Sequence, residues 1–469
     1  MTKIPHEETT TQEQDGASRR DVIKAVAGLA GAAAIGSSLS ITSSEAAALP
    51  APEASGIDHI VVLMQENRSF DHMLGWLPGA NGVQAGRSFV DNAGNTVNSQ
   101  PLTLYQNCSS RDPSHSFSGG RTHLAGGAVN GFLKTAPVGD HFAVGYYGAK
   151  DVLFFAHAAR YWTICDNYFS GFLGSTYPNR FYMHSGQTDR VSNTSTRSNL
   201  TTIWDLAAAA GVKARYYYQD LAFTALWGTK YTDISLPFSQ FLSDAAAGTL
   251  PAISYIDPRF SGEGAGTSTD DHPLADIRNG QVLMNAIYTA LRTSPNWSNT
   301  LFIINYDEWG GFADHVVPPM APVSAAEATV GNVDVTDPAT GPAAYLGFRV
   351  PCVLIGPRAR RGSVAHGVYD PNAILNLISW RFGLPGLGVR SATSGNIVNA
   401  LNFSGPANTS LPPAITGLLP FNPDGPTYGQ SCAANPMANL EEIHQWHNDH
   451  FADAEELKRL MVEAGFKTA

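Results

Sequence analysis

The sequence has few charged residues, no excess of positive charge and no apolar run long enough to cross a membrane. Of its 469 residues, 15% are charged and 43% are hydrophobic. This composition excludes a disordered or fibrous chain and indicates a globular protein. The net charge of -11 argues against a nucleic-acid partner held by a general basic field. It also argues against adhesion to anionic membranes through bulk charge, but leaves peripheral contact with zwitterionic lipids open.

The first 48 residues have the layout of an export signal rather than of a folded segment. Paired arginines, Arg19 and Arg20, precede Lys24 and a weakly apolar, Ala/Gly-rich run that ends at Leu39. That run is shorter than the roughly 20 residues that span a bilayer. The small residues Ala46–Ala48 offer a cleavage site. We predict a twin-arginine signal peptide over residues 1–48, recognised by the twin-arginine translocase, and a periplasmic, cell-wall-associated or secreted protein.

Cysteine is scarce, and its spacing excludes one class of metal site. The four cysteines are Cys108, Cys165, Cys352 and Cys432, and no two form a CxxC pair of the kind that binds zinc. An exported protein is free to form disulfides, and four cysteines allow three complete pairings. The sequence leaves open which pairing forms and whether the thiols stay free.

Apolar strand-like runs alternate with amphipathic helical segments, which favours an α/β fold with a mostly parallel central sheet. We expect residues 49–403 to form this α/β domain, and residues 404–469 to form a loop-rich wrap followed by a helix. The expected loops are Gly79–Gly139 and Ala321–Pro342. The expected strands are Ile57–Met64, Tyr161–Phe169, Ala214–Tyr218, Ala252–Ile256, Leu301–Tyr306 and Val350–Ile355, and the expected helices are Leu200–Ala210, Asp276–Arg292, Pro371–Phe382 and Asn439–Phe466.

Two of the expected strands end in oxygen-bearing side chains. Glu66 and Asn67 follow the first strand closely, and Asp307 and Glu308 follow the strand Leu301–Tyr306. Chemistry in open α/β sheets gathers just beyond the carboxyl ends of strands. Three carboxylates and an amide oxygen at one point suit a hard divalent cation, which would offset their mutual repulsion. The alternative for each pair is a helix cap or a solvated loop.

A hydroxyl pair at a predicted helix start is the candidate nucleophile. Ser175 and Thr176 precede Pro178 and Arg180, and backbone N–H groups at a helix N-terminus favour an anion such as phosphate. The guanidinium of Arg180 is suited to donate two parallel hydrogen bonds to phosphate oxygens. Ordinary helix capping by the Ser or Thr is the alternative. Three histidines, His115, His272 and His315, lie in polar loops near these segments.

These segments together resemble the bacterial phosphoesterase family, which comprises secreted phospholipases C, related haemolysins and respiratory-burst-inhibiting acid phosphatases. The resemblance runs in order from Ile57 to Leu384, which makes a chance match improbable. It is carried by Asp58–His72, Gly174–Arg180, Tyr306–His315 and Phe348–Pro351.

The resemblance implies an alkaline-phosphatase-like α/β core and a covalent phosphoenzyme mechanism with one or more divalent metals. Calcium, magnesium or manganese suits oxygen ligands, and zinc or iron would suit a site that a histidine joins. By motif match, Thr176 would be the nucleophile, with Ser175 as second choice, and Arg180 would bind phosphate. His115, His272 and His315 would bind phosphate and protonate the leaving group. The implied metal ligands are Glu66, Asn67, Asp307 and Glu308.

The functional prediction is a secreted, metal-dependent phospholipase C that cleaves phosphatidylcholine-like lipids through a phosphothreonine. An acid phosphatase acting on small phosphomonoesters is the alternative with the same chemistry. A non-catalytic secreted binding protein is a third alternative, but it predicts loss of a ligand or hydroxyl, and all are present. One departure from the family is Pro371, where many members have histidine, so Asp370 receives no role.

Overall fold

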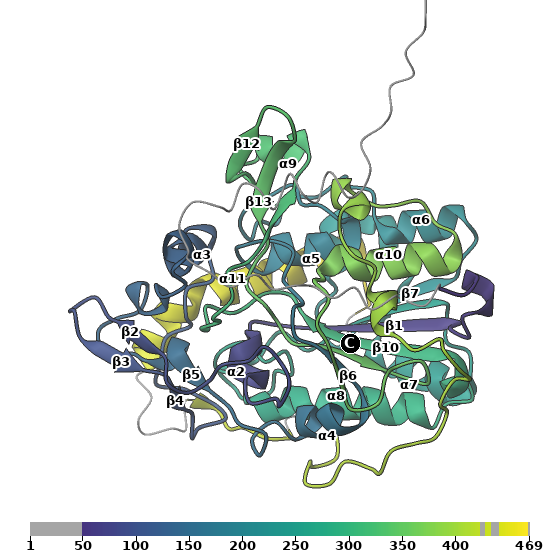
Figure 1. Ribbon diagram of the computed structural model, residues 1–469, viewed down its shortest axis with the longest axis horizontal. Coiled ribbons are helices and arrows are strands. Elements are labelled where there is room, and N and C mark those ends of the chain that lie inside the picture. Colours follow the sequence, from purple (N-terminus) through teal and green to yellow (C-terminus); the bar gives the residue numbers. More distant parts are fainter. Residues whose placement is uncertain (1–48, 423–426, 433–439, 468–469) are drawn as a thin grey trace, which may run out of the picture. The chain divides into compact units, whose positions relative to one another are not determined.

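The structure is a computed structural model that describes residues 49–422, 427–432 and 440–467 (Figure 1). These residues all belong to one compact unit, residues 47–469. The predicted signal peptide lies outside the described residues and stays a prediction, as does the domain division at residue 403. Within the described ranges, no helix combines the length and apolar character that crossing a membrane requires.

An eight-stranded sheet forms the core, and β1 lies at its centre. β1 pairs in parallel with β10 on one side and with β9 on the other. Only β14 runs antiparallel to its neighbours, so the prediction of a mostly parallel α/β sheet is confirmed. The strand order is β15 (Ser363–Ala365), β6 (Thr163–Cys165), β14 (Cys352–Ile355), β10 (Thr300–Tyr306), β1 (His59–Gln65), β9 (Ile253–Asp257), β7 (Ala214–Tyr218) and β8 (Ser235–Pro237).

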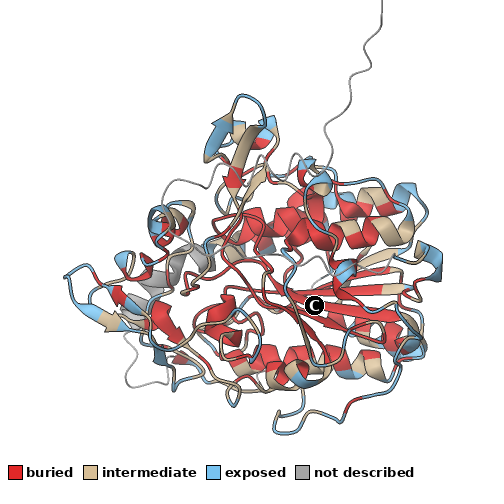
Figure 2. Cartoon of the chain, viewed as in Figure 1, coloured by how far each residue is buried: buried red, intermediate tan, exposed pale blue. Residues whose placement is uncertain are grey.

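Helices cover both faces of this sheet (Figure 1). The sheet is therefore buried on both sides, which explains why its central strands are nearly continuous apolar runs. All seven residues of β10 are buried, and the strands stand out as buried in Figure 2. One face carries α5 (Thr176–Ser185), α6 (Ile203–Ala209) and α10 (Pro371–Phe382), and the other carries α4 (Leu153–Tyr161), α7 (Phe238–Ala247) and α8 (Ile277–Arg292).

The register of β1 and β10 brings the two predicted ligand pairs together. The last paired residues are Gln65 and Tyr306, so Glu66 and Asp307 follow side by side at the carboxyl edge of the sheet. The backbone N–H of Asp307 donates to the carbonyl of Gln65 at 3.0 Å. At Gly310, with φ of +62°, an added Cβ would lie 2.1 Å from the carbonyl oxygen of Asn67. Only glycine fits this approach.

The prediction of a loop over Ala321–Pro342 was wrong. The segment contributes to a three-stranded sheet in the order β11 (Met320–Pro322), β13 (Gly341–Tyr345) and β12 (Val335–Asp337), with helix α9 (Ala325–Thr329) between β11 and β12. A reciprocal capping box of Ser324 and Glu327 starts α9. The strands are short and lack apolar alternation, so their periodicity gives no signal.

Two other segments differ in extent from their predictions. Within Tyr161–Phe169 only Thr163–Cys165 is a strand, because Tyr161 ends α4. The predicted loop Gly79–Gly139 contains α3 (Phe117–Leu124) and a hairpin. The hairpin joins β2 (Ser88–Val90) and β3 (Thr96–Asn98), and β4 (Gln100–Pro101) pairs with β5 (Gly145–Tyr146).

The remaining helices are short, apart from the C-terminal one. Helix α2 spans Phe70–Leu74, and Asp370 caps α10 by accepting from the backbone N–H of Ala373. The C-terminal helix α11 (Leu440–Ala464) packs against the segment Phe223–Tyr231. The 3-10 helices are Pro52–Ala54, Ala125–Gly127, Phe132–Lys134, Phe142–Val144, Phe223–Tyr231, Trp297–Asn299, Val389–Ala392 and Ile397–Ala400.

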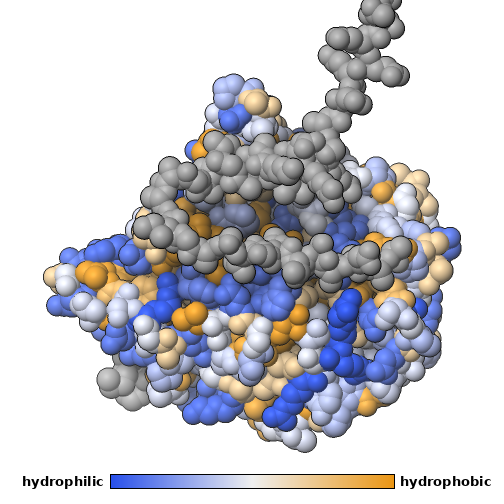
Figure 3. All heavy atoms as spheres, viewed as in Figure 1, coloured by the Kyte–Doolittle hydropathy of each residue, from blue (hydrophilic) through white to orange (hydrophobic). Residues whose placement is uncertain are grey.

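One disulfide forms, between Cys108 and Cys432, with Cα atoms 5.5 Å apart. The two other cysteines, Cys165 and Cys352, are free and buried and lie opposite each other on β6 and β14. On the part of the surface visible in Figure 3, apolar residues form small, separate patches among hydrophilic ones. This is the pattern expected of a surface that faces water.

Candidate active site

The predicted nucleophile and a predicted metal ligand are in direct contact. Thr176 is the first residue of α5, and its Oγ1 donates a hydrogen bond to Oε1 of Glu66 at 2.8 Å. Ser175 is the N-cap residue, but its side chain makes no capping hydrogen bond. Helix capping, the alternative use of this hydroxyl pair, is therefore absent. The α5 N-terminus points Thr176 at the carboxyl end of β1.

Asp307 and Glu308 are held by backbone N–H groups at the end of β10. Oδ1 of Asp307 accepts from the backbone N–H of Asn67 at 3.2 Å and from that of Glu308 at 2.6 Å. Oε2 of Glu308 accepts from the backbone N–H of Gly310 at 2.6 Å. Each carboxylate thus has one oxygen fixed by the backbone, which sets the direction of the other oxygen.

The four predicted ligands offer buried oxygens of the type that a hard metal ion binds. Every one of these residues is fully buried, and each keeps a buried oxygen that accepts no hydrogen bond. Buried polar atoms normally accept a hydrogen bond, whereas three of these oxygens only lie 3.3 to 3.9 Å from Arg180 or His115. Oxygen atoms of this kind suit a hard divalent cation. The four atoms are Glu66 Oε2, Asn67 Oδ1, Asp307 Oδ2 and Glu308 Oε1.

The electrostatics of the site also favour a bound cation. Burial raises the pKa of Asp307 to about 8, against the opposing effect of Arg180. Burial, together with the charge of Asp307, holds the pKa of Glu308 well above its usual range. Without a cation, Asp307 and Glu308 therefore resist ionisation, and a divalent cation would favour their charged forms.

Arg180 lies among carboxylates rather than at an open phosphate site. Its Nη1 donates to Oδ1 of Asp257 at 3.0 Å, and its Nε lies 3.3 Å from Oδ2 of Asp307. Its Nη2 lies 3.8 Å from Oε2 of Glu66. The side chain is 1% exposed. In this arrangement the guanidinium neutralises the site, and its predicted contact with phosphate stays a prediction.

Replacing Arg180 with alanine is expected to destabilise the metal-free protein by about 3–5 kcal/mol, because removing one partner of a buried ion pair leaves the other charge uncompensated. Chemical unfolding in the presence of a chelator measures this. Arg180→Lys keeps the charge and serves as the control, with a smaller expected loss. A loss below about 1 kcal/mol for the alanine variant, typical of a surface pair, would contradict this account of the site.

Two of the three predicted histidines adjoin the carboxylates and form one cluster. Nε2 of His115 lies 3.9 Å from Oε1 of Glu308, and the rings of His115 and His272 are 5.7 Å apart. His272 is fully buried, with Nδ1 3.2 Å from Oε2 of Glu263 and Nε2 3.6 Å from Oδ2 of Asp112. A carboxylate therefore faces each nitrogen of the His272 ring.

The third histidine, His315, lies in a different cluster. Its Nδ1 is 2.6 Å from Oδ2 of Asp71 and its Nε2 is 3.0 Å from Oδ1 of Asn81. Arg349 bridges Asp71 and Asp314 beside it. None of the contacts described for His315 reaches Thr176 or the four ligands, so the structure does not bring this residue to the nucleophile.

Comparison with known proteins shows to which family the chain belongs. Residues 57–385 match the Phosphoesterase family over most of the chain. The chain belongs to the phosphoesterase family. This confirms the resemblance stated from the motifs.

This phosphoesterase is similar to phospholipases C from a plant and from a bacterium. It is 31% identical to non-specific phospholipase C6 of Arabidopsis thaliana over 68% of this chain and 65% of the relative. The chain thus spans just under two thirds of that plant protein. It is 31% identical to phospholipase C A of Mycobacterium tuberculosis strain H37Rv over 87% of this chain and 90% of the relative. A solved alkaline-phosphatase-superfamily protein from Vibrio parahaemolyticus overlaps 74% of this chain and 71% of its own, with a TM-score of 0.37 and 9% identity.

The predicted nucleophile, Thr176, lies beneath α11. A pocket of about 20 Å³ contains Glu66, Thr176 and Arg180, which is room for about one water molecule. The hydroxyl of Tyr177 donates to the backbone carbonyl of Asp453 on α11 at 3.0 Å. Entry of a phosphate ester requires these walls to move. The other lining residues are Asn193, Leu221, Phe223, Phe260, Ala454 and Leu457.

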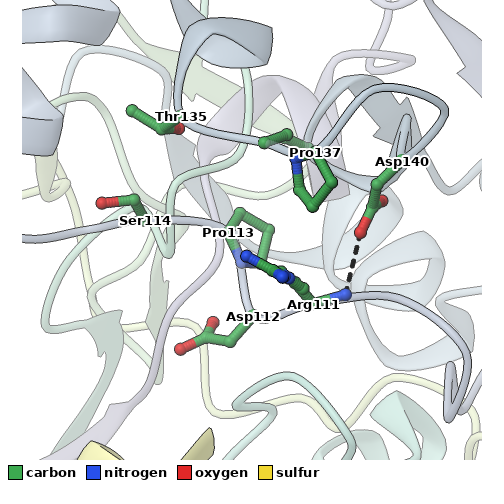
Figure 4. Close-up of a pocket in the computed structure, with 9 residues that line it drawn as sticks. Arg111, Asp112, Pro113, Ser114, Thr135, Pro137 and Asp140 are labelled. Carbon is green, nitrogen blue, oxygen red and sulfur yellow. Dashed lines mark hydrogen bonds between the residues drawn. The ribbon is translucent and has the colours of Figure 1, made fainter. Parts of the chain in front are cut away.

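A larger cavity, of about 340 Å³, lies beside the segment that carries Asp112 (Figure 4). Asp112 lines this cavity and also contacts His272. The backbone N–H of Arg111 donates to Oδ2 of Asp140 at 2.8 Å, which closes one wall. The remaining lining residues are Pro113, Ser114, Thr135, Ala136, Pro137 and Ala143.

Three carboxylates near the candidate site were not predicted from the sequence: Asp112, Asp257 and Glu263. Asp112 stands three residues before His115, so a search for acidic neighbours of the histidines would have found it. Asp257 is the last residue of β9. Ligand sites in open α/β sheets lie beyond the carboxyl ends of the strands, and this rule would have pointed to it. Glu263 lies in a Gly-rich turn with no pattern that distinguishes it from a solvated residue.

Proposed function

We propose that this phosphoesterase is a secreted, metal-dependent phospholipase C that cleaves phosphatidylcholine-like lipids at the glycerol-side P–O bond. The products would be diacylglycerol and a phosphorylated head group. The observation that carries the proposal is the Thr176 hydroxyl, hydrogen-bonded to Glu66 at 2.8 Å beside four unsatisfied ligand oxygens. The names of the plant and bacterial relatives support the lipid substrate, and the paired arginines of the leader support export.

In the proposed reaction, Oγ1 of Thr176 attacks phosphorus in line with the departing glycerol oxygen. Oε1 of Glu66 orients the hydroxyl and accepts its proton as the bond to phosphorus forms. The P–O bond to glycerol breaks, and the head-group phosphate is left esterified to Thr176 as a phosphothreonine. His272, or His115 beside it, protonates the departing alkoxide. Water then attacks the phosphothreonine and gives a proton to the same histidine, the P–O bond to Oγ1 breaks, and Glu66 returns the proton to Oγ1.

The metal would be held by Glu66, Asn67, Asp307 and Glu308. When bound, it would screen the charge of the phosphate oxygens and lower the pKa of the attacking hydroxyl. The all-oxygen ligand set favours calcium, magnesium or manganese, and zinc would need a nitrogen ligand such as His115. Peripheral contact with a zwitterionic membrane is part of the proposal, because the substrate lies in the bilayer.

An acid phosphatase that acts on small phosphomonoesters is the second candidate. The observation that favours it is the limited space of about 20 Å³ around Thr176, which suits a small substrate better than a phospholipid. The covalent chemistry would be the same in both cases, and only the pocket walls would differ.

A two-substrate assay separates the candidates. The metal-loaded protein is assayed on phosphatidylcholine vesicles and on a soluble aryl phosphate monoester at equal substrate phosphate. We expect release of phosphocholine from the vesicles with little monoester turnover. Efficient monoester hydrolysis without lipid cleavage would replace the phospholipase assignment with the phosphatase one. Absence of turnover on both would overturn the proposed function.

A further inference from the structure

The disulfide lies in a small apolar cluster of its own, apart from the main core. Cys108, Leu274 and Cys432 are each buried and pack together. The backbone N–H of Cys432 donates to the carbonyl of Gly264 at 2.7 Å. The side chain of Gln106 exchanges two hydrogen bonds, of 2.8 and 2.9 Å, with the backbone of Gln430. The disulfide thus binds three loops that are remote in the sequence.

Two of these loops carry the members of the His272 cluster. Asp112 stands four residues after Cys108, and Glu263 immediately precedes Gly264, which accepts from Cys432. His272 stands two residues before Leu274. The carboxylates that face the two nitrogens of His272 therefore come from segments that are joined through the disulfide cluster.

The His272 loop needs such support because its backbone is strained. Asp271 has φ of 76° and Leu274 has φ of 82°, a region that side chains other than glycine rarely adopt. Such conformations persist only where the surroundings enforce them. Arg68 donates to the carbonyl of Asp271 at 2.7 Å, and Tyr306 donates to its carboxylate at 2.5 Å. On the other side of His272, Leu274 packs on the disulfide.

We propose that the Cys108–Cys432 disulfide is a positioning element that holds His272 between Glu263 and Asp112. Full activity then requires that Cys108 and Cys432 are oxidised to the disulfide. Reduction adds two electrons and two protons and gives two thiols, while a dithiol reductant becomes a disulfide. The loops of Asp112 and Glu263 would then separate, and His272 would lose its fixed orientation. This inference rests on the proposed function and on the role of His272 as acid.

The consequence is that the chain would gain full activity only where disulfides persist. Cytosolic thiols are kept reduced, whereas exported proteins are free to oxidise. A phospholipase that matures this way would be weakly active before export, when it is close to the lipids of its own cell. The free thiols of Cys165 and Cys352 lie inside the sheet and take no part in this change.

The test compares oxidised and dithiothreitol-reduced full-length, metal-loaded protein, with thiol counting to confirm reduction. On reduction we expect kcat to fall about tenfold or more, because a misplaced acid loses part of the roughly 10²–10⁴-fold that general acid–base catalysis contributes. KM, metal content and the circular dichroism spectrum should stay unchanged. The Cys108→Ala/Cys432→Ala variant is the matched control and should show the low kcat with no response to reductant. An unchanged kcat after complete reduction would overturn the proposal.

A double-mutant cycle distinguishes loss of the orientation of His272 from a general destabilisation of the fold. If the disulfide acts through the His272 cluster, reduction should have little further effect in the Glu263→Gln variant, because the two changes remove the same interaction. Equal, additive losses would overturn the proposal. If Glu263→Gln fails to fold, His272→Ala provides the same background. Lack of turnover by the oxidised protein on any phosphate ester would instead contradict the proposed function.

Discussion

Replacing Thr176 with valine is expected to lower kcat on lipid and aryl phosphates alike by about 10⁴-fold or more, the loss typical of removing a nucleophile. Valine has the shape of threonine without the hydroxyl, so the packing at the start of α5 is kept. What is lost is Oγ1, which lies 2.8 Å from Glu66. Steady-state kinetics on both substrates, with metal content measured in parallel, provide the comparison.

Ser175→Ala is the matched control for this variant. Ser175 is the adjacent hydroxyl and makes no capping hydrogen bond, so its removal should leave kcat within a few-fold of the parent. The opposite result, in which Ser175→Ala abolishes turnover and Thr176→Val does not, would move the nucleophile to Ser175. Retained activity in both variants would contradict a covalent mechanism at this helix start.

Removing divalent cations with a chelator is expected to lower kcat by about 10³-fold or more, because a metal supplies several kcal/mol of stabilisation to the charged transition state. The four buried oxygens without hydrogen-bond donors are the physical reason. Activity should return on titration with calcium, magnesium or manganese, and the ion that restores it at the lowest concentration identifies the metal.

The same ion should raise the melting temperature of the chelated protein, because a ligand that binds only the folded state stabilises it. Asp307→Asn is the control, since it removes one carboxylate oxygen and keeps the shape of the side chain. We expect this variant to bind less metal and to show a smaller thermal shift. Full activity after exhaustive chelation, with no metal found by elemental analysis, would contradict the assignment of the site.

Features that depend on local pattern were accessible from the sequence. The strands β1 and β10 are apolar runs that end in ligand pairs, and the parallel register that joins Glu66 to Asp307 follows from the general rule for α/β sheets. The helices α8 and α10 were predicted to within one residue at each end. The position of Thr176 at the start of α5 followed from its Pro-Asn-Arg context, whereas its contact with Glu66 is seen only in the structure.

Features that depend on distant contacts were not accessible. Arg180 looks like a phosphate ligand in the sequence, yet Asp257 on a separate strand pairs with it at 3.0 Å. Glu263 reaches His272 only because the chain folds back through a Gly-rich turn. The pairing of Cys108 with Cys432 spans 324 positions, and no local rule selects one of the three possible pairings.

The most direct test of the central claim is to trap the covalent intermediate on Thr176. Metal-loaded protein is mixed with excess substrate, quenched in acid within one turnover, digested and analysed by mass spectrometry. With phosphatidylcholine as substrate, we predict one phosphocholine group on Thr176 and none in the Thr176→Val variant. Phosphate on Ser175, or turnover at full rate with no phosphorylated residue in α5 at any quench time, would contradict this account.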